Sequence, residues 1–269
     1  SCAFIGKVGD DMHGEFLRAT LVANDVNCDG LVLDPNCFTT LAFVALSEEG
    51  ERTFSFARKP GADTQLRPEE LRRDVIENSR VFHVGSLSLT DEPARSATIA
   101  ALDVAKAAGA VMSYDPNYRD SLWTSAEVAS EQMRSIVTYM DLIKISCEET
   151  ELLTGRSDPA EAARILLGQG AQVTCVTLDD EGALVATKDG SATVPSFKVD
   201  AVDTTGAGDS FWGGFLCAFV DADIRPENVT LDDARSFARF GNAVASLCVR
   251  RRGAIPAMPT LDEVEKVLS

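Results

Sequence analysis

Two glycines and an aspartate stand directly before an apolar stretch, in the segment Gly206-Ala-Gly-Asp209. The apolar residues that follow recur at helical spacing, which predicts a helix whose first turn contains the glycines. Unpaired N–H groups and the positive end of the dipole make a helix N-terminus bind anions, and glycine lets a phosphate approach the backbone. The segment is therefore predicted to bind a phosphate group. The apolar residues are Phe211, Trp212, Phe215, Leu216 and Phe219.

Asp209 falls in the first turn of the same predicted helix. A carboxylate beside a phosphate site repels the ligand, so its position indicates a chemical task. A general base for a hydroxyl group that attacks a γ-phosphate is such a task. Two simpler interpretations stay open. Asp209 could only complement the helix dipole, which contributes about 0.3–1 kcal/mol, and the glycines could only serve close packing.

Other phosphate-binding motifs do not match this chain. The sequence contains no Gly-x-x-x-x-Gly-Lys followed by Ser or Thr, which excludes a P-loop. Phe211 stands where a dinucleotide fingerprint has its third glycine, which argues against a Rossmann oxidoreductase.

From about residue 80, short apolar runs alternate with longer helical stretches. This alternation predicts βαβ units and a doubly wound α/β fold with a mainly parallel sheet. Strands are expected over 81–85, 110–115, 141–145 and 173–178, and helices over 93–108, within 124–139, before Gly155, over 158–168 and over 231–249.

Polar or small residues end four of these strands, at Gly85, Asp115, Ser146 and Thr177. Ligands of open parallel sheets bind beyond the carboxyl ends of the strands, so a polar cleft is predicted there. Each residue taken alone could instead belong to a turn or a helix cap.

Residues 39–46 and 51–56 interrupt the alternation, because they read as two strands around a four-residue turn. Such a hairpin is expected to be antiparallel and to stand apart from the main sheet. We interpret residues 39–60 as a lid over the cleft and residues 1–38 and 61–269 as the core domain. An edge hairpin without a function is the alternative.

The composition is that of a globular protein, with 45% hydrophobic residues and a net charge of −17. The acidic balance argues against binding to nucleic acid or to an anionic membrane, since both need excess Lys and Arg. Seven cysteines without a Cys-x-x-Cys pair fit reduced thiols and a cytoplasmic protein. Two histidines offer no zinc ligand set, and neither a signal peptide nor a membrane-spanning run is visible.

The segment Asp203-Thr-Thr-Gly-Ala-Gly-Asp-Ser210 resembles the C-terminal signature of the PfkB/ribokinase-type sugar kinases. The opening Phe4-Ile-Gly-Lys-Val-Gly-Asp-Asp11 resembles the end of their N-terminal signature. The resemblance covers the whole chain and is strongest to fructokinases. It also includes Arg58-Lys-Pro-Gly-Ala-Asp63, Phe82-His-Val-Gly-Ser-Leu-Ser88, Asp115-Pro-Asn-Tyr-Arg119 and Gly253-Ala-Ile-Pro256.

The resemblance implies a ribokinase-like three-layer fold with a small β lid, and phosphorylation of a sugar by ATP with Mg²⁺. D-fructose, phosphorylated at its 6-hydroxyl group, is the expected substrate. A 2-keto-3-deoxygluconate kinase and a non-catalytic sugar- or nucleotide-binding homologue are the alternatives. Homodimers through the lid are also implied, with Leu41, Phe43, Phe54 and Phe56 as candidate interface residues.

The resemblance also assigns roles to the phosphate end of the site. Asp209 is expected to be the catalytic base, with the amides of Gly206, Ala207 and Gly208 as the anion hole. Glu149 corresponds to the acid of the family's Asn-x-x-Glu element, which organises Mg²⁺ through water, while Ser146 replaces the asparagine near the nucleotide. An acidic first helical turn is the simpler reading of Glu149.

Further roles follow from the same resemblance. Thr177 and Gly182 match the nucleotide loop, in which Asp179 replaces a glycine, and Asn242 matches a position near adenine or ribose. Arg58, Asn117 and Arg119 match positions associated with the sugar, although both arginines could be solvated surface charges. Asp203, Thr205 and Gly253 match a monovalent-cation site that holds K⁺ in the family, and Ala257 stands where ribokinases have a serine ligand.

Family members begin with a strand that carries a sugar-binding Asp, followed by a Gly-Gly pair and an Asn. None of these is present at the start of this chain. The expectation from sequence is therefore that N-terminal strands are missing and that a protein of only these 269 residues is poorly active.

Overall fold

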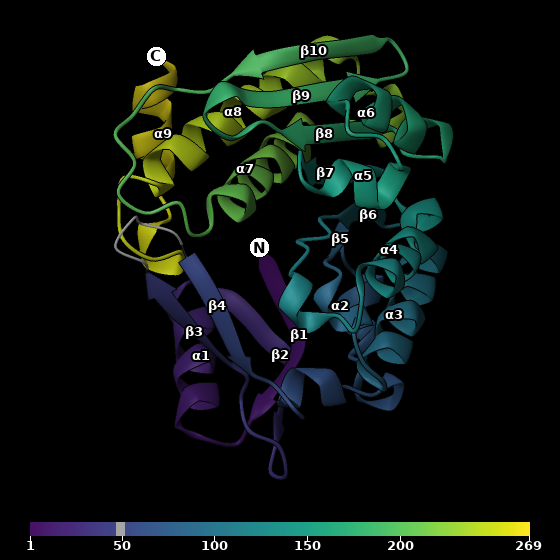
Figure 1. The fold of residues 1–269 in the computed structure, drawn as a ribbon, viewed down its shortest axis with the longest axis vertical. Helices are drawn as coiled ribbons and strands as arrows, with labels where there is room; N and C mark the ends of the chain where they lie inside the picture. Colours follow the sequence, from purple (N-terminus) through teal and green to yellow (C-terminus); the bar gives the residue numbers. More distant parts are fainter. Residues whose placement is uncertain (47–51) are drawn as a thin grey trace. The chain divides into compact units, whose positions relative to one another are not determined.

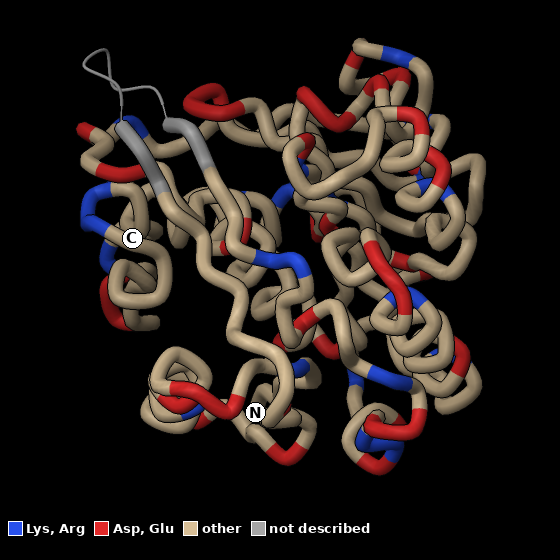
Figure 2. The backbone as a smooth tube through the Cα atoms, turned by 60° about the horizontal axis from the view of Figure 1, so that its bottom comes forward, with Lys and Arg blue, Asp and Glu red and all other residues tan. Residues whose placement is uncertain are grey.

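The computed structural model describes residues 1–46 and 52–269. The chain divides into two compact units, Ser1–Tyr139 and Met140–Ser269. Figure 1 shows strands and helices alternating along most of the chain, as the sequence pattern predicts. Acidic and basic positions are interspersed along the backbone (Figure 2), and no helix of the described residues is long and apolar enough to cross a membrane.

The first unit opens with a parallel pair of strands. Strand β1 (Cys2–Gly9) pairs with β2 (Val26–Asp34), and helix α1 (Met12–Ala23) connects them. The ammonium of Lys7 lies 2.9 Å from a carboxylate oxygen of Asp34, and both residues are buried, so an ion pair joins the two strands.

Asp11 joins the start of α1 to the segment that enters the hairpin. Its Oδ1 accepts hydrogen bonds from the amide of Gly14 and the hydroxyl of Thr39, both at 2.8 Å, and its Oδ2 accepts from the amide of Thr39 at 2.8 Å. These bonds, foremost the one from the Thr39 amide, lower the pKa of Asp11 to about 2. Because an aspartate in the unfolded chain titrates near about 3.9, this carboxylate stabilises the fold above that pH. Its contribution is lost as the pH falls towards about 2.

The variant Asp11→Asn should therefore have a lower Tm at neutral pH than the wild type. Its free energy of unfolding should also depend less on pH between about 4 and 2, since the titrating cap is gone. Urea denaturation at several pH values measures both effects. The exposed neighbour provides a control, because Asp10→Asn should leave Tm within about 1 °C. An Asp11→Asn protein with the wild-type pH dependence would contradict this account of the cap.

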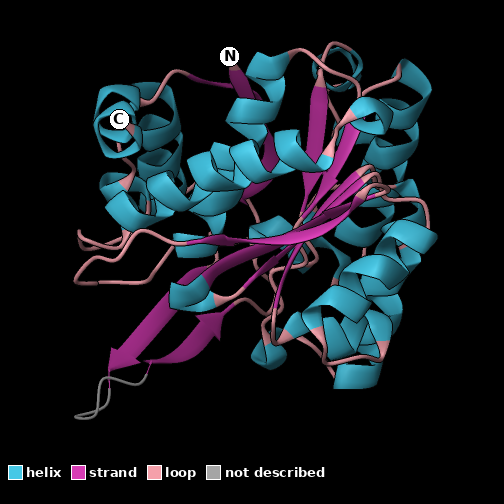
Figure 3. Ribbon diagram, turned by 90° about the horizontal axis from the view of Figure 1, so that it is seen from above, coloured by secondary structure: helices cyan, strands magenta, loops and turns pink. Residues whose placement is uncertain are grey.

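The predicted hairpin is confirmed for the residues that the structure describes. Strands β3 (Leu41–Leu46) and β4 (Arg52–Ala57) pair antiparallel in a two-stranded sheet of their own. Figure 3 shows them as two neighbouring magenta arrows. The predicted turn at 47–50 and the side chain of Phe54 lie outside the described residues. Of the candidate interface residues, Phe43 is 57% exposed, whereas Leu41 and Phe56 are half-buried.

The remainder of the first unit follows the predicted alternation. Strand β5 (Val81–Val84) pairs parallel with β6 (Val111–Tyr114), and α3 (Ala94–Ala108) connects them and ends at Gly109, whose φ is 78°. The short α2 (Arg73–Glu77) precedes β5, and α4 (Ala126–Ser135) follows β6 and is capped by Ser125.

The second unit contains four strands in the order β10-β9-β8-β7. Strands β7 (Leu142–Ser146) and β8 (Val173–Thr177) are parallel, as predicted, and α5 (Glu149–Thr154) and α6 (Pro159–Gly168) connect them. The sequence did not predict the antiparallel strands that follow, because their glycines and small residues weaken the alternating pattern. These are β9 (Gly182–Thr187) and β10 (Gly190–Pro195).

Three helices complete the second unit: α7 (Ala207–Ala222), α8 (Leu231–Cys248) and α9 (Leu261–Leu268). Aromatic side chains fix α7 against α8. The ring of Phe215 stacks on Trp212 at 4.8 Å and meets the ring of Phe237 edge-on at 5.5 Å. Trp212 and Phe215 belong to α7 and Phe237 to α8, so the contact of Phe215 with Phe237 packs the middle of α7 against α8.

Candidate active site

The predicted phosphate-binding segment forms the N-terminus of α7. Gly206 is the N-cap residue and has a left-handed backbone with φ 78°. A Cβ atom at this position would lie 2.9 Å from the Cβ and 3.3 Å from the Cα of Ala254. Both the conformation and the available space therefore require glycine here. The predicted anion site is at a helix N-terminus, as expected from the spacing.

The amides of this turn are not equivalent. The N–H of Ala207 donates to the carbonyl of Thr204 at 3.2 Å, so this predicted anion-hole donor is engaged within its own loop. Gly208 and Asp209 follow in the first turn, and the side chain of Asp209 is exposed. Ser210 is buried, and its hydroxyl donates to the carbonyl of Ala207 at 2.9 Å. The hydrogen bond of Ser210 thus fixes the turn, while the carboxylate of Asp209 in the same turn stays accessible to solvent.

Sequence reasoning missed Lys144, which lies beside the same turn. Its side chain is 5% exposed, and its Nζ would be only 2.9 Å from a Cβ atom placed on Gly208. The signal in the sequence is a lysine inside the otherwise apolar strand Leu-Ile-Lys-Ile, where its neighbours Ile143 and Ile145 are fully buried. A buried ammonium adds positive charge to the predicted anion site.

Glu149 lies at the start of α5, just beyond the end of β7. It is 4% exposed, and its Oε2 accepts a hydrogen bond from the amide of Ser146 at 2.8 Å. This burial argues against the simpler interpretation of Glu149 as a solvent-exposed acid in the first turn of a helix. Among the described residues no group of three or more His, Cys, Asp or Glu side chains is arranged to hold a metal ion.

The predicted nucleotide loop follows β8. Thr177 ends the strand, and its hydroxyl donates to the carbonyl of Ile145 on β7 at 3.4 Å. The amide of Leu178 donates to the carbonyl of Gly182 at 2.8 Å and closes the loop. Asp179, which replaces the family's glycine, has φ 51°. Aspartate tolerates this left-handed conformation better than most residues, so the substitution is compatible with a tight turn.

Asn242 lies on α8 and is 4% exposed. Its Nδ2 donates to the carbonyls of Val194 at 3.0 Å and Pro195 at 3.1 Å. The amide group therefore anchors the end of β10 to α8.

The predicted cation-site residues are brought together by Asp203. Its Oδ1 accepts from the amide of Thr205 and its Oδ2 from the amide of Gly253, both at 2.9 Å. Asp203 thereby connects two loops that are 50 residues apart in the chain. Ala257, at the position of the ribokinase serine, is fully buried.

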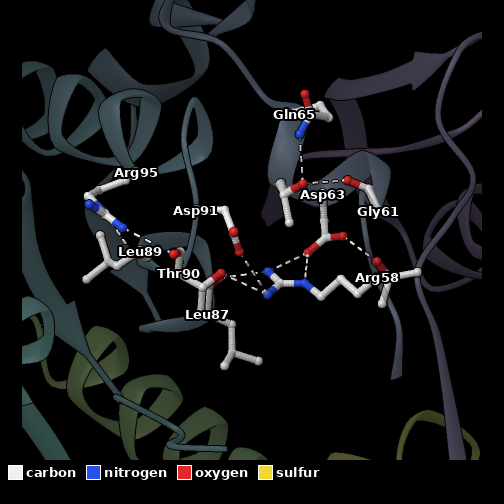
Figure 4. Close-up of polar contacts among 11 residues, drawn as sticks. Arg58, Gly61, Asp63, Gln65, Leu87, Leu89, Thr90, Asp91 and Arg95 are labelled. Atoms are coloured by element: carbon white, nitrogen blue, oxygen red, sulfur yellow. Dashed lines mark hydrogen bonds and ion pairs between the residues drawn. The ribbon is translucent and has the colours of Figure 1, made fainter. Parts of the chain in front are cut away.

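The residues predicted to contact a sugar lie in the first unit. Asn117 has φ 50°, and Arg119 is half-buried, with its Nη1 donating to the carbonyl of Tyr118 at 2.7 Å. The loop before them is tied down by Ser86, whose amide donates to the carbonyl of Pro116 at 3.0 Å. Arg58 is 9% exposed and takes part in a dense set of polar contacts within this unit (Figure 4).

Comparison with known proteins gives a consistent result. The sequence profile described as pfkB family carbohydrate kinase matches residues 1–261. The curated protein named probable fructokinase-4 from Arabidopsis thaliana is 46% identical over 271 residues, which is 99% of this chain and 81% of that protein.

Solved structures show the same similarity. The structure of fructokinase with bound ATP from Xylella fastidiosa has a TM-score of 0.90 and 35% identity, and the match covers 99% of this chain and 84% of that one. A fructokinase double mutant from Vibrio cholerae O395, in its fructose-, ADP- and potassium-bound form, has a TM-score of 0.88 and 33% identity, with the same coverage. The ribokinase-like α/β fold expected from the sequence is confirmed.

Proposed function

Because this chain belongs to the pfkB family of carbohydrate kinases, we propose that it transfers the γ-phosphoryl group of ATP to the 6-hydroxyl group of D-fructose. The observation that carries the proposal is the first turn of α7, where an exposed carboxylate adjoins a glycine-capped helix N-terminus. The fructokinases that match this chain over nearly its whole length support fructose as the acceptor.

Asp209 acts as the general base in this reaction. It accepts the proton of the sugar hydroxyl as the oxygen attacks the phosphorus. The amides of Gly206 and Gly208, the helix dipole and the ammonium of Lys144 stabilise the negative charge that develops on the transferring group. The contact of Phe215 with Phe237 fixes α7 against α8, so little reorganisation of the helix is needed during the reaction.

The residues near the predicted phosphate site are of the kind that bind Mg²⁺ in proteins. The ion usually retains several waters and binds through one or two carboxylates together with substrate phosphates. The second unit offers a single buried acid in the expected place, Glu149, and the described residues contain no larger ligand cluster. Glu149 would hold the hydrated ion. When bound, Mg²⁺ neutralises charge on the phosphates.

The other predicted residues take the following roles. Ser146, Thr177 and Gly182 bind the nucleotide, and Asn242 positions that region by anchoring β10. Asn117 and Arg119 contact the sugar, residues 39–60 form the lid of a core made of residues 1–38 and 61–269, and the exposed face of the hairpin, which includes Phe43, forms a homodimer. All seven cysteines are free thiols, which supports a cytoplasmic location.

A monovalent cation, K⁺, is proposed to bind at the loops that Asp203 connects. Replacing KCl by choline chloride should then lower the turnover of the wild type, because the cation stabilises the loop that leads into the anion site. Asp203→Asn should abolish most of this dependence on K⁺. Steady-state rates in the two salts at equal ionic strength measure the effect. Equal rates in both salts would exclude a functional cation here.

The proposed reaction is tested by ADP release with a panel of sugars. We expect D-fructose with MgATP to give the highest kcat/KM, and product analysis to show phosphate on the 6-oxygen. A preference for 2-keto-3-deoxygluconate would identify the alternative kinase. Binding of sugar or nucleotide without ADP release would identify a non-catalytic homologue and overturn the proposal.

A further inference from the structure

One carboxylate contacts the residues that flank both strands of the hairpin. Thr40 directly precedes β3 and Arg58 directly follows β4, next to the terminal strand pair Leu41 and Ala57. The hydroxyl of Thr40 donates to Oδ1 of Asp63, and Nε of Arg58 donates to Oδ2 of the same side chain at 2.7 Å. Asp63 therefore fixes the base of the hairpin from both sides.

The remaining nitrogens of Arg58 reach a different segment. Nη1 donates to the hydroxyl of Thr90 and Nη2 to the carbonyl of Leu87, both at 2.8 Å (Figure 4). These residues follow β5, in the loop that Ser86 ties to Pro116, next to the predicted sugar residues. We call Thr40, Arg58, Asp63, Thr90 and the carbonyl of Leu87 the hairpin latch.

The guanidinium of the latch is buried, whereas the carboxylate of Asp63 is half-buried. The side chain of Arg58 is 6% exposed, and both outer nitrogens and Nε are bonded to groups of this unit. Charge-assisted bonds of this kind are roughly twice as strong as neutral ones. Gly61 has an ordinary φ of −89°, yet a Cβ atom there would lie 1.9 Å from the Thr40 hydroxyl and 2.6 Å from Oδ1 of Asp63. The glycine is required by the space that the latch occupies.

We propose that Arg58 and Asp63 are positioning residues, which hold the lid hairpin in register with the loop at the end of β5 and so complete the sugar site. The inference rests on the proposed function. It gives Arg58 an indirect role, in place of the direct sugar contact expected from sequence, because its guanidinium already bonds three protein groups.

Three variants test the latch: Asp63→Asn, Arg58→Lys and Gly61→Ala. Each should raise KM for fructose about tenfold or more, since each disrupts charge-assisted bonds in the latch. KM for ATP should change less than about twofold. Hydrogen exchange of the described hairpin amides should become about tenfold faster. The double variant Arg58→Lys/Asp63→Asn should be no worse than the stronger single variant, because both changes open one latch.

Two matched controls come from the same protein. Asp74→Asn breaks an exposed pair with Arg72, and Gly168→Ala places a Cβ atom where nothing lies within 4 Å. Neither should change KM for fructose or hairpin exchange.

The proposal is overturned if hairpin exchange stays at the wild-type rate in all three latch variants. It is also overturned if Arg58→Lys alone raises KM while Asp63→Asn and Gly61→Ala do not, since that pattern belongs to a direct sugar ligand. A wild-type protein that phosphorylates no sugar would refute the proposed function instead, and the exchange measurement would still decide whether the latch holds the hairpin.

Discussion

Replacement of Asp209 by asparagine should lower kcat for fructose phosphorylation by about 10²–10⁴-fold, the usual contribution of a general base. Asparagine has nearly the same shape but cannot accept the hydroxyl proton. ATP should bind Asp209→Asn at least as tightly as the wild type, because the change removes a negative charge near the phosphates. Steady-state kinetics give kcat, and titration calorimetry gives the Kd of ATP.

A carboxylate at the other end of the same helix provides the control. Asp221 is exposed in the last turn of α7, so Asp221→Asn should keep the wild-type kcat. Turnover of Asp209→Asn above about a tenth of the wild-type value would contradict a base role. Asp209 would then only complement the helix dipole.

The variant Gly206→Ala should lower kcat about a hundredfold and weaken ATP binding. A left-handed backbone costs a residue with a Cβ atom roughly 1–2 kcal/mol, and the new methyl group would press on Ala254 at 2.9 Å. Relief of that contact moves the turn that carries Gly208 and Asp209, and a shift of about 1 Å in a catalytic group can cost about 10²-fold in rate. Kinetics and calorimetry measure both effects.

Gly213→Ala is the matched control, because it lies on the exposed side of the same helix and its Cβ atom would meet nothing within 4 Å. This change should leave kcat unaltered and raise Tm slightly, since alanine favours a helix by about 1 kcal/mol over glycine. Full activity of Gly206→Ala would show that the cap geometry is not needed for phosphoryl transfer.

Local pattern predicted most of the α/β framework. The strands at Val81–Val84 and Leu142–Ser146 are apolar runs bounded by polar residues, and Gly109 and Gly155 end their helices in left-handed conformations. Strand β10 was not predicted because its sequence lacks a hydrophobic face. Four of its six residues are exposed. Its position depends on pairing with β9, which a single sequence does not reveal.

The candidate site likewise contains residues that local sequence spacing predicted and contacts that it did not. Gly206 and Asp209 were predicted because they share one helical turn, so their spacing in sequence is their spacing in space. The contacts of Arg58 were not predictable, since Thr90 lies 32 residues further along the chain. The place of Lys144 beside Gly208 likewise depends on how α7 packs, which no local spacing encodes.

The ammonium of Lys144 occupies the space that a side chain at position 208 would need, and this limits the substitutions that position 208 can accept. Alanine at 208 would displace a buried ammonium from its site. A side chain at 208 would therefore require the Lys144 ammonium to shift, and shortening residue 144 would make room for it but remove the buried positive charge beside the predicted anion site. Positions 144 and 208 form a compensating pair, to be redesigned together.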